Sequence, residues 1–202
     1  MGAWRTGLLG ALGYEALAPH GSGTCGVIGT GLQAFTQCRA IAALGQPARF
    51  RIYSRSPENR AAFAAKLQRD TGIATQAADS AQEVVEQADS LLVATNASQP
   101  VFNMAWLERC RHVTTLGPKF TDRHEVSPAI ADWAEIILSD SPQQIAAQGD
   151  KHFLHGSGHL TRVQHLGHAL AQPDPAAKQR RSLFLSAGLS GTEVALLAAL
   201  AA

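Results

Sequence analysis

The chain has 202 residues, of which 46% are hydrophobic and 16% charged, enough to form the core of one globular domain or of one domain with part of another. Its 17 Lys and Arg residues against 16 Asp and Glu residues give a net charge of +1 at pH 7, which offers no strongly basic surface for nucleic acid or for an anionic membrane. The three cysteines form no C-x-x-C pair, and neither a signal peptide nor an apolar run of membrane-spanning length is present, so we expect a cytoplasmic protein without disulfides.

The first expected element is a helix over Thr6–Ala18, ended by the turn-forming residues at positions 19–23. From Thr24 onward, short apolar runs alternate with longer amphipathic stretches, which is typical of parallel strands joined by crossover helices. We therefore predict an α/β fold with a doubly wound parallel sheet. Strands are expected at Thr24–Gly29, Arg49–Ser54, Ile73–Gln76, Ser90–Thr95, His112–Leu116 and Glu135–Ser139. Helices are expected at about Leu32–Leu44, Pro57–Asp70, Ala81–Glu86, Ser127–Trp133 and Pro142–Ala147.

The residues after Gly149 have a different composition, because five of the eight histidines lie between Lys151 and His168. They span a Gly-Ser-Gly sequence that would interrupt a helix, whereas metal ligands must converge on one point. We therefore expect structural or exposed histidines and assign no metal. The histidines concerned are His152, His155, His159, His165 and His168. A last helix is expected over Thr192–Ala201.

A glycine motif, G-x-G-x-x-A, stands between the first expected strand and the helix that follows it. In that context the first glycine permits a tight turn, the second lets the backbone approach a pyrophosphate, and the alanine lets the helix pack closely on the sheet. The N-terminus of the helix then faces the anion. The motif therefore predicts a dinucleotide site of Rossmann type. Its residues are Gly29, Thr30, Gly31, Leu32, Gln33 and Ala34.

The end of the second expected strand decides between NAD(H) and NADP(H). A site for NAD(H) usually has a carboxylate there that binds the ribose 2′-hydroxyl, but no acidic residue occurs between Glu15 and Glu58. Arg55, flanked by Ser54 and Ser56, could instead bind a 2′-phosphate through charge-assisted hydrogen bonds. We therefore predict NADP(H), with NAD(H) as the less favoured cofactor. The alternative is a solvated turn in which one of the two serines caps the following helix.

Two further strand ends are expected on the ligand side, because ligands in open α/β sheets bind outside the carboxyl ends of the strands. Thr95 and Asn96 end the fourth expected strand, and Leu116 and Gly117 end the fifth. These four residues are expected to flank the nicotinamide.

Several segments together resemble the ornithine cyclodeaminase/mu-crystallin family, and the resemblance covers essentially the whole chain. It implies NAD(H) or NADP(H) as cofactor, and an activity among cyclodeaminases, ketimine reductases, alanine dehydrogenases and reductases of cyclic imino acids. The runs Gly117–Glu125 and Gly188–Val194 are most similar to the branch that reduces Δ1-pyrroline-2-carboxylate and Δ1-piperideine-2-carboxylate. The segments that carry the resemblance are Arg5–Gly7, Gly26–Ala34, Tyr53–Ser56, Ala94–Thr95, Leu116–Gly117, Asp140–Ser141 and Leu183–Leu189.

The resemblance also implies roles for individual residues. Arg5 matches an arginine that holds the substrate carboxylate, a task that suits a guanidinium. Cyclodeaminases carry an aspartate at the position of Lys119, and the lysine argues against cyclodeamination because that reaction needs a carboxylate to manage protons. Lys119 is expected to be a proton donor or a second contact to the substrate carboxylate, or else a surface lysine beside Asp122. Positions near the cofactor are matched by Thr6, Ser186 and Gly188.

The function expected from this resemblance is NADPH-dependent reduction of a cyclic imino acid to L-proline or L-pipecolate. The alternatives are ornithine cyclodeaminase or alanine dehydrogenase activity, or a catalytically silent protein that binds NADP(H). Family members carry a domain-sized portion before the position of Arg5, so we expect that substrate and dimerisation portion to be missing, and a homodimer where the full architecture is present. Residues 23–150 are expected to form the NADP(H)-binding domain, with residues 1–22 and 151–202 belonging to the substrate and dimerisation domain.

Overall fold

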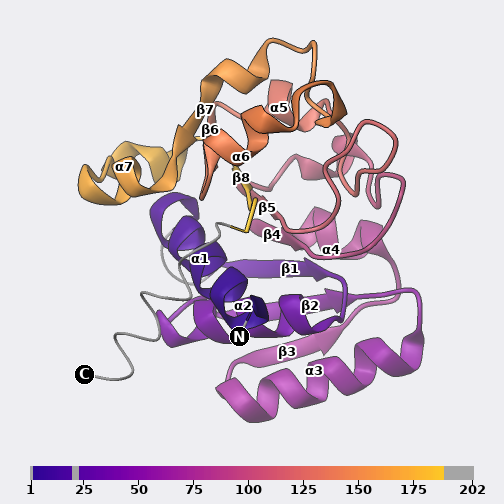
Figure 1. Cartoon of the computed structure of the whole chain (residues 1–202). Helices are drawn as coiled ribbons and strands as arrows, with labels where there is room; N and C mark the ends of the chain where they lie inside the picture. The colour runs from indigo at the N-terminus through magenta and orange to yellow at the C-terminus, as the bar shows by residue number, and fades with distance from the viewer. Residues whose placement is uncertain (1, 20–22, 189–202) are drawn as a thin grey trace.

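The computed structural model describes residues 2–19 and 23–188, and these form a three-layer α/β structure around one parallel sheet (Figure 1). The strand order in that part of the chain is β3-β2-β1-β4-β5-β8-β6-β7, and every pair of neighbours is parallel. The chain therefore winds outward from β1 in both directions, as in a doubly wound Rossmann sheet. The strands are β1 (Thr24–Ile28), β2 (Arg49–Tyr53), β3 (Ala74–Ala77), β4 (Ser90–Val93), β5 (His112–Thr115), β6 (Ile136–Ser139), β7 (Val163–His165) and β8 (Ser182–Leu185).

The helices begin and end at residues suited to those positions. Ser56 accepts a hydrogen bond from the Asn59 amide at the start of α3, Pro57 occupies the first turn, and Gly72 ends the helix in a left-handed conformation. The α-helices are α1 (Gly2–Leu17), α2 (Leu32–Ala43), α3 (Pro57–Thr71), α4 (Ala81–Gln87), α5 (Ile130–Trp133), α6 (Pro142–Ala147) and α7 (Leu166–Ala171). Shorter 3-10 helices cover Met104–Leu107, Gly149–Lys151, His159–Arg162 and Pro175–Gln179. Within the described ranges, no helix combines the length and the apolar character needed to cross a membrane.

The alternating side chains of the strands divide the core between the two faces of the sheet. Val27 and Leu92 point to the face that is covered by α1, α2 and α3. Leu91 and Val93 point to the opposite face, where they pack with residues of α4 and α5. Because both faces are covered at the centre of the sheet, β4 and β8 are buried along their whole length, whereas β2 near the edge is buried at every second residue.

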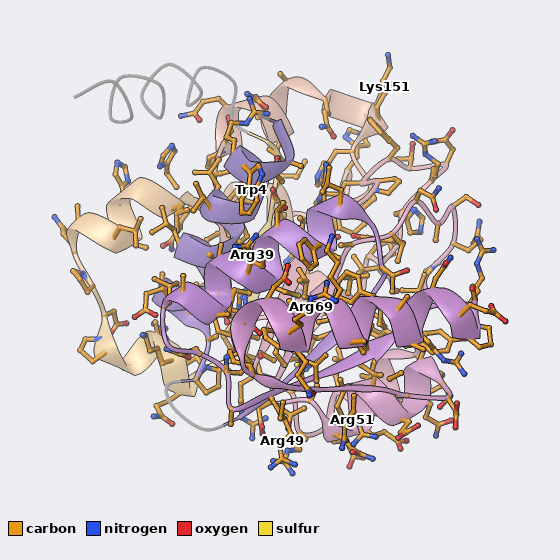
Figure 2. The ribbon with its side chains drawn as sticks, turned by 90° about the horizontal axis from the view of Figure 1, so that it is seen from below. Trp4, Arg39, Arg49, Arg51, Arg69 and Lys151 are labelled. Carbon is orange, nitrogen blue, oxygen red and sulfur yellow. The ribbon has the colours of Figure 1, made fainter. Side chains whose placement is uncertain are left out.

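Helix α1 packs closely against α2 and the sheet because its contact face is made of glycines. A β-carbon at Gly7 or Gly10 would collide with α2, and one at Gly13 would collide with the ring of Phe184 in β8. Figure 2 shows Trp4 of α1 beside α2, where its ring lies 5.2 Å from the guanidinium carbon of Arg39. The N-terminal helix is therefore an integral part of the structure around the sheet.

The predicted doubly wound sheet is confirmed, and all six expected strands are present with small shifts at their ends. The sequence analysis missed β7, β8 and α7. All three come from residues beyond 150, and the two strands among them extend the sheet past the boundary that was expected for the nucleotide-binding domain. The helix expected over Thr192–Ala201 lies outside the described residues.

Two expected helices have different bounds. Helix α1 begins at Gly2, four residues before Thr6, because the residues from Gly2 to Arg5 continue the same packing against α2. The helix expected over Ser127–Trp133 is reduced to Ile130–Trp133, because the residues around Pro128 form a turn in which the Ile130 amide donates to the Ser127 carbonyl.

The buried histidine of β5 makes a testable contribution to acid sensitivity. Both ring nitrogens of His112 are hydrogen-bonded, to Ser182 and Thr114, and burial lowers the pKa of the imidazole to about 3. In the unfolded chain the same group titrates near pH 6.5. As the pH falls from about 6.5 toward 3, His112 therefore binds a proton in the unfolded state but not in the folded state, and the free energy of unfolding decreases. We expect His112→Asn to reduce the loss of unfolding free energy over this range by about 1 kcal/mol per pH unit, as measured by urea unfolding at several pH values.

His152 is a second group that makes the free energy of unfolding depend on pH in this range. Burial also lowers the pKa of His152, to about 4, so the variant retains part of the slope. The control is His155→Asn, because His155 is exposed. Equal slopes in the wild type and in His112→Asn would contradict the assignment.

Candidate functional site

The carboxyl ends of five neighbouring strands lie in line along one edge of the sheet. The register runs from Ile28 of β1 to Val93 of β4, Thr115 of β5, Leu185 of β8 and Ser139 of β6. Since all these strands are parallel, the loops that follow them share that edge. Open α/β sheets bind their ligands there, where the winding direction changes.

The glycine motif after β1 forms an open cradle at this edge. Gly29 has a φ of +117°, and a β-carbon at this position would collide with the carbonyl oxygen of Ala94 after β4, so only glycine fits. Gly31 precedes α2, has no atom of another part of the chain near its missing side chain, and supplies no side-chain cap to the helix. Ala34, in the first turn of α2, is fully buried. The amides at the start of α2 are thus available to an anion, and the cradle fits a pyrophosphate.

The other residues of the glycine motif face solvent to different degrees. Leu32 is 67% exposed, which is unusual for a leucine, and Gln33 is exposed beside it. Thr30 is half-buried. An exposed leucine at the mouth of a nucleotide cradle offers an apolar contact to a flat ring system.

The turn after β2 contains both features that the sequence offered as alternatives: a serine that caps α3 and an exposed arginine. Ser56 caps α3, and its hydroxyl donates to the carboxylate of Glu58 at 2.8 Å. The Ser54 hydroxyl donates to the Ser56 carbonyl, whereas the side chain of Arg55 is exposed. The capping alternative therefore describes Ser56 correctly, and it leaves the Arg55 guanidinium directed to solvent. Hydrogen bonds from its own backbone amide and from Ser56 hold the pKa of Glu58 below its usual value, so this turn carries a carboxylate as well as a guanidinium.

A buried carboxylate that sequence reasoning did not assign joins the ends of β4 and β5. Glu125 is completely buried, and its Oε2 accepts hydrogen bonds from the amide and the hydroxyl of Thr95, at 2.7 and 2.8 Å. Its Oε1 accepts from the hydroxyl of Thr115 at 2.6 Å and from the amide of Gly117 at 2.5 Å. The signal in the sequence was weak, because a glutamate ten residues after a strand is ordinarily a surface residue.

Lys119 is buried, and the alternative of a surface lysine beside Asp122 is wrong. The residue is 7% exposed, and its ammonium donates to the carbonyl of Gly117 at 2.9 Å. Burial lowers the pKa of this ammonium to about 8, while the negative charges of Glu125 and Asp140 oppose the shift. A lysine with such a pKa is protonated at neutral pH and able to give up its proton, as a general acid requires.

The end of β8 brings the N-terminal helix into the same region. The buried carboxylate of Asp140, after β6, accepts hydrogen bonds from the amides of Ala187 and Gly188 at 2.6 and 2.9 Å. The guanidinium of Arg5 lies beside Gly188, 3.8 Å from where a β-carbon of that glycine would be. Ser186 is buried, and its hydroxyl makes no hydrogen bond within the described part of the chain. Such an orphaned hydroxyl fits a polar ligand at this edge.

Several predicted residues have their polar groups occupied within the protein. The hydroxyl of Thr6 donates to the Gly2 carbonyl inside α1, and that of Thr95 donates to Glu125. Asn96 is exposed, and Leu116 is half-buried beside Gly117. These residues shape the edge of the sheet, whereas Gly31 and Arg55 are exposed and the Ser186 hydroxyl is buried without a hydrogen bond in the described part of the chain.

The five histidines of the C-terminal segment do not converge on one point. His159 pairs with Asp132 at 2.7 Å, and the rings of His165 and His168 lie 5.7 Å apart. Only His152 is fully buried: its Nδ1 accepts from the Leu154 amide, and burial together with the charge of Lys119 lowers its pKa to about 4. Across residues 2–19 and 23–188, no three His, Cys, Asp or Glu side chains form a group suited to a metal ion.

Comparisons with known proteins show a similarity that extends over most of the chain. The sequence model of the ornithine cyclodeaminase/mu-crystallin family matches residues 1–200. An uncharacterized cyclodeaminase of Sinorhizobium fredii is 28% identical over 193 residues, which cover 94% of this chain and 58% of that protein. A Δ1-pyrroline-2-carboxylate reductase of Bacillus cereus is 31% identical over 147 residues, which cover 72% of this chain and 45% of that protein.

A solved structure is also similar over most of the chain. It is that of the Thermococcus litoralis Δ1-pyrroline-2-carboxylate reductase in complex with NADH and L-proline, with a TM-score of 0.77 and 25% identity. The match covers 91% of this chain and 58% of that one. The chain therefore spans about half the length of the relatives it matches.

Proposed function

Because the chain belongs to the ornithine cyclodeaminase/mu-crystallin family, we propose that it acts in the NADPH-dependent reduction of cyclic imino acids. The substrates of this proposal are Δ1-pyrroline-2-carboxylate, reduced to L-proline, and Δ1-piperideine-2-carboxylate, reduced to L-pipecolate. The observation that carries the proposal is the buried Lys119 in the loop after β5, at the same sheet edge as the glycine cradle after β1, with only β4 between the two strands. A proton donor and a dinucleotide cradle at one sheet edge are the two components that reduction of a C=N bond requires.

When bound, the nicotinamide supplies the hydride for the imine carbon. The protein's part is to supply the proton and to orient the substrate. The ammonium of Lys119, with a pKa of about 8, holds a proton at neutral pH and gives it to the imine nitrogen. Its hydrogen bond to the Gly117 carbonyl fixes the direction of the side chain. Lys119 serves in this proposal as the general acid, and a second carboxylate contact is its alternative role.

Arg5 is the proposed anchor of the substrate carboxylate, since a guanidinium binds a carboxylate through two parallel hydrogen bonds. Its position beside Gly188 places it near the carboxyl ends of β8 and β6. The approach of Arg5 to Gly188 supports the joint assignment of residues 1–22 and 151–202 to the substrate side. In this proposal residues 23–150 carry most of the cofactor contacts, and Ser186, directly after β8, adds a hydroxyl.

The proposal includes a homodimer in the cytoplasm. Trp4, Leu8 and Leu12 repeat every four residues along α1, and each is at least 40% exposed, which supports a covered surface in an assembly. The three cysteines are unpaired and buried, in agreement with a reducing compartment.

The preference for NADP(H) rests on Arg55, and its test compares two cofactors with two variants. We expect Arg55→Gln to raise the Kd for NADPH about tenfold, equivalent to about 1.4 kcal/mol, while the Kd for NADH stays within about twofold. Glu58→Gln is expected to lower the Kd for NADPH a few-fold, because it removes a negative charge beside the Ser56 hydroxyl. The measurement is a fluorescence titration with each cofactor.

The matched control for this test is Arg69→Gln. Arg69 lies near the other end of α3, and its side chain is 72% exposed (Figure 2). Loss of NADPH and NADH affinity to the same degree in Arg55→Gln would show that the residue does not distinguish the two cofactors.

The function itself is tested with the 202-residue chain. NADPH and NADH are titrated by fluorescence, Δ1-pyrroline-2-carboxylate is then added, and the absorbance of the reduced nicotinamide is followed. Tighter binding of NADPH and its oxidation on addition of the imine are the expected results. Binding without oxidation would restrict the chain to a cofactor-binding role, and NAD+ reduction with L-alanine, or release of ammonia from L-ornithine, would favour the alternative activities.

A further inference from the structure

We propose that Glu125 is a positioning residue of this site. Its buried carboxylate holds the ends of β4 and β5 together, so that Thr95, Gly117 and Lys119 keep fixed positions beside one another. The inference rests on the proposed function for its meaning in catalysis. Its geometry stands on the described residues alone.

The first argument is the completeness of the hydrogen bonding. Each carboxylate oxygen of Glu125 accepts two hydrogen bonds, and the four donors come from the two strand ends, two from Thr95 after β4 and one each from Thr115 and Gly117 of the β5 end. A charged carboxylate with four donors holds the groups that donate to it firmly in place, because charge-assisted hydrogen bonds are about twice as strong as neutral ones. Removing its charge leaves buried donors without an acceptor.

The second argument is the close fit around Gly117. A β-carbon at this residue would collide both with the carboxylate of Glu125 and with the carbonyl oxygen of Thr95. The glycine is therefore required by the carboxylate rather than by its own backbone conformation, since Gly117 has no positive φ. The carbonyl of the same glycine accepts the hydrogen bond from Lys119, so the carboxylate fixes the lysine through one residue.

The third argument is the charge around Lys119. Two carboxylates act on its ammonium: Glu125 from the loop after β5 and Asp140 from the end of β6. His152, from the segment after α6, also faces it and is neutral at pH 7 because its pKa is lowered to about 4. Both carboxylates favour the protonated lysine against the effect of burial, so loss of the Glu125 charge makes Lys119 give up its proton at lower pH.

The test uses Glu125→Gln, which preserves the size of the side chain and removes its charge. Two readouts are made by NMR on the chain without cofactor or substrate. Hydrogen exchange of the Thr95 and Gly117 amides is expected to accelerate at least tenfold, while the amides of β1 and β2 keep their rates. The titration midpoint of Lys119, followed by the Cε shift and assigned from Lys119→Met, is expected to fall by about one pH unit.

The control is Asp122→Asn, since Asp122 is an exposed carboxylate of the same loop and both readouts should stay at wild-type values. If exchange accelerates throughout the Glu125→Gln variant, the test passes to Thr115→Val, which removes one donor to Oε1 and keeps the charge. In that variant we expect faster exchange at Gly117, with an unchanged Lys119 midpoint. The proposal would be overturned if the Gly117 amide exchanged at the wild-type rate in a folded Glu125→Gln or Thr115→Val variant. It would also be overturned by an unchanged Lys119 midpoint in Glu125→Gln.

Because neither readout needs turnover, the result is separable from the proposed function. Suppose that the chain fails to oxidise NADPH with the imine while Glu125→Gln still changes amide exchange and the Lys119 midpoint. That result would support the positioning role of Glu125 and contradict only the proposed function. A purely structural role would change global stability and exchange, but it would leave the Lys119 midpoint where it is.

Discussion

Replacement of Lys119 by methionine is expected to lower the rate of imine reduction by about 10²- to 10⁴-fold, the usual contribution of a general acid. Methionine fills a similar volume and needs no hydrogen-bond partner, so the fold should tolerate it in a buried position. The affinity for NADPH should stay within about twofold, because the proposed role of Lys119 is toward the substrate and not toward the cofactor. The measurement is steady-state kinetics at saturating cofactor, together with a fluorescence titration of NADPH.

The pH dependence of the rate tests the role of Lys119 as a general acid more specifically than the loss of rate alone. A general acid must be protonated, and the pKa of Lys119 is about 8, so the wild-type rate is expected to be constant below this pH and to fall as the pH rises through it. The residual rate of Lys119→Met should lack that descending limb. Lys151→Met serves as the control, because Lys151 is exposed and its side chain points away from the body of the protein (Figure 2). An unchanged rate in Lys119→Met would leave the lysine without a role in the chemistry.

A carboxylate at Gly31 is expected to abolish cofactor binding without unfolding the protein. Gly31 has ordinary negative φ, and the space beside it is open, so the folded chain accommodates a side chain there. That space is the cradle in which a pyrophosphate meets the amides of α2, and an aspartate would fill it and repel the anion. We expect Gly31→Asp to raise the Kd of NADPH at least 100-fold, equivalent to about 3 kcal/mol, with the thermal midpoint within about 2 °C of wild type.

The control for the added charge is Gln143→Asp. Gln143 is exposed in the first turn of α6, so the substitution also adds an acidic residue at the start of a helix, but away from the glycine motif. Its cofactor affinity should equal that of the wild type. NADPH binding of normal strength in Gly31→Asp would show that the dinucleotide does not lie on this cradle.

The sequence was sufficient for the winding of the sheet but not for its full extent. β1 and β4 were predictable as short, largely apolar runs, and β2 as an alternation of polar and apolar residues, each followed by turn-forming residues. β8 was missed although its four residues are all buried, because its partners β5 and β6 are distant in sequence and no local pattern shows that a strand inserts between them. β7 has only three residues, which is too short for any periodicity.

The candidate site shows the same division between local and non-local information. The Gly29–Ala34 motif could be read locally, because the conformations of its glycines and the start of α2 depend on neighbouring residues. The burial of Lys119 and the four hydrogen bonds of Glu125 could not, because they depend on the order β4-β5-β8-β6 in the sheet, which brings together residues far apart in the sequence. Charged residues in a loop are normally solvated, and only the tertiary structure shows which of them are enclosed.

The position of β8 also bears on how this chain is completed during synthesis. On a ribosome, β5 and β6 emerge well before residues 182–185, yet in the finished sheet β8 lies between them and pairs with both. A nascent chain that stops before Ser182 therefore has an open slot one strand wide in the middle of its sheet, flanked by two unpaired edges. Such edges recruit strands from other chains, so products terminated early in translation should aggregate or be degraded. Full translation past Leu185 is thus a condition for closing the sheet.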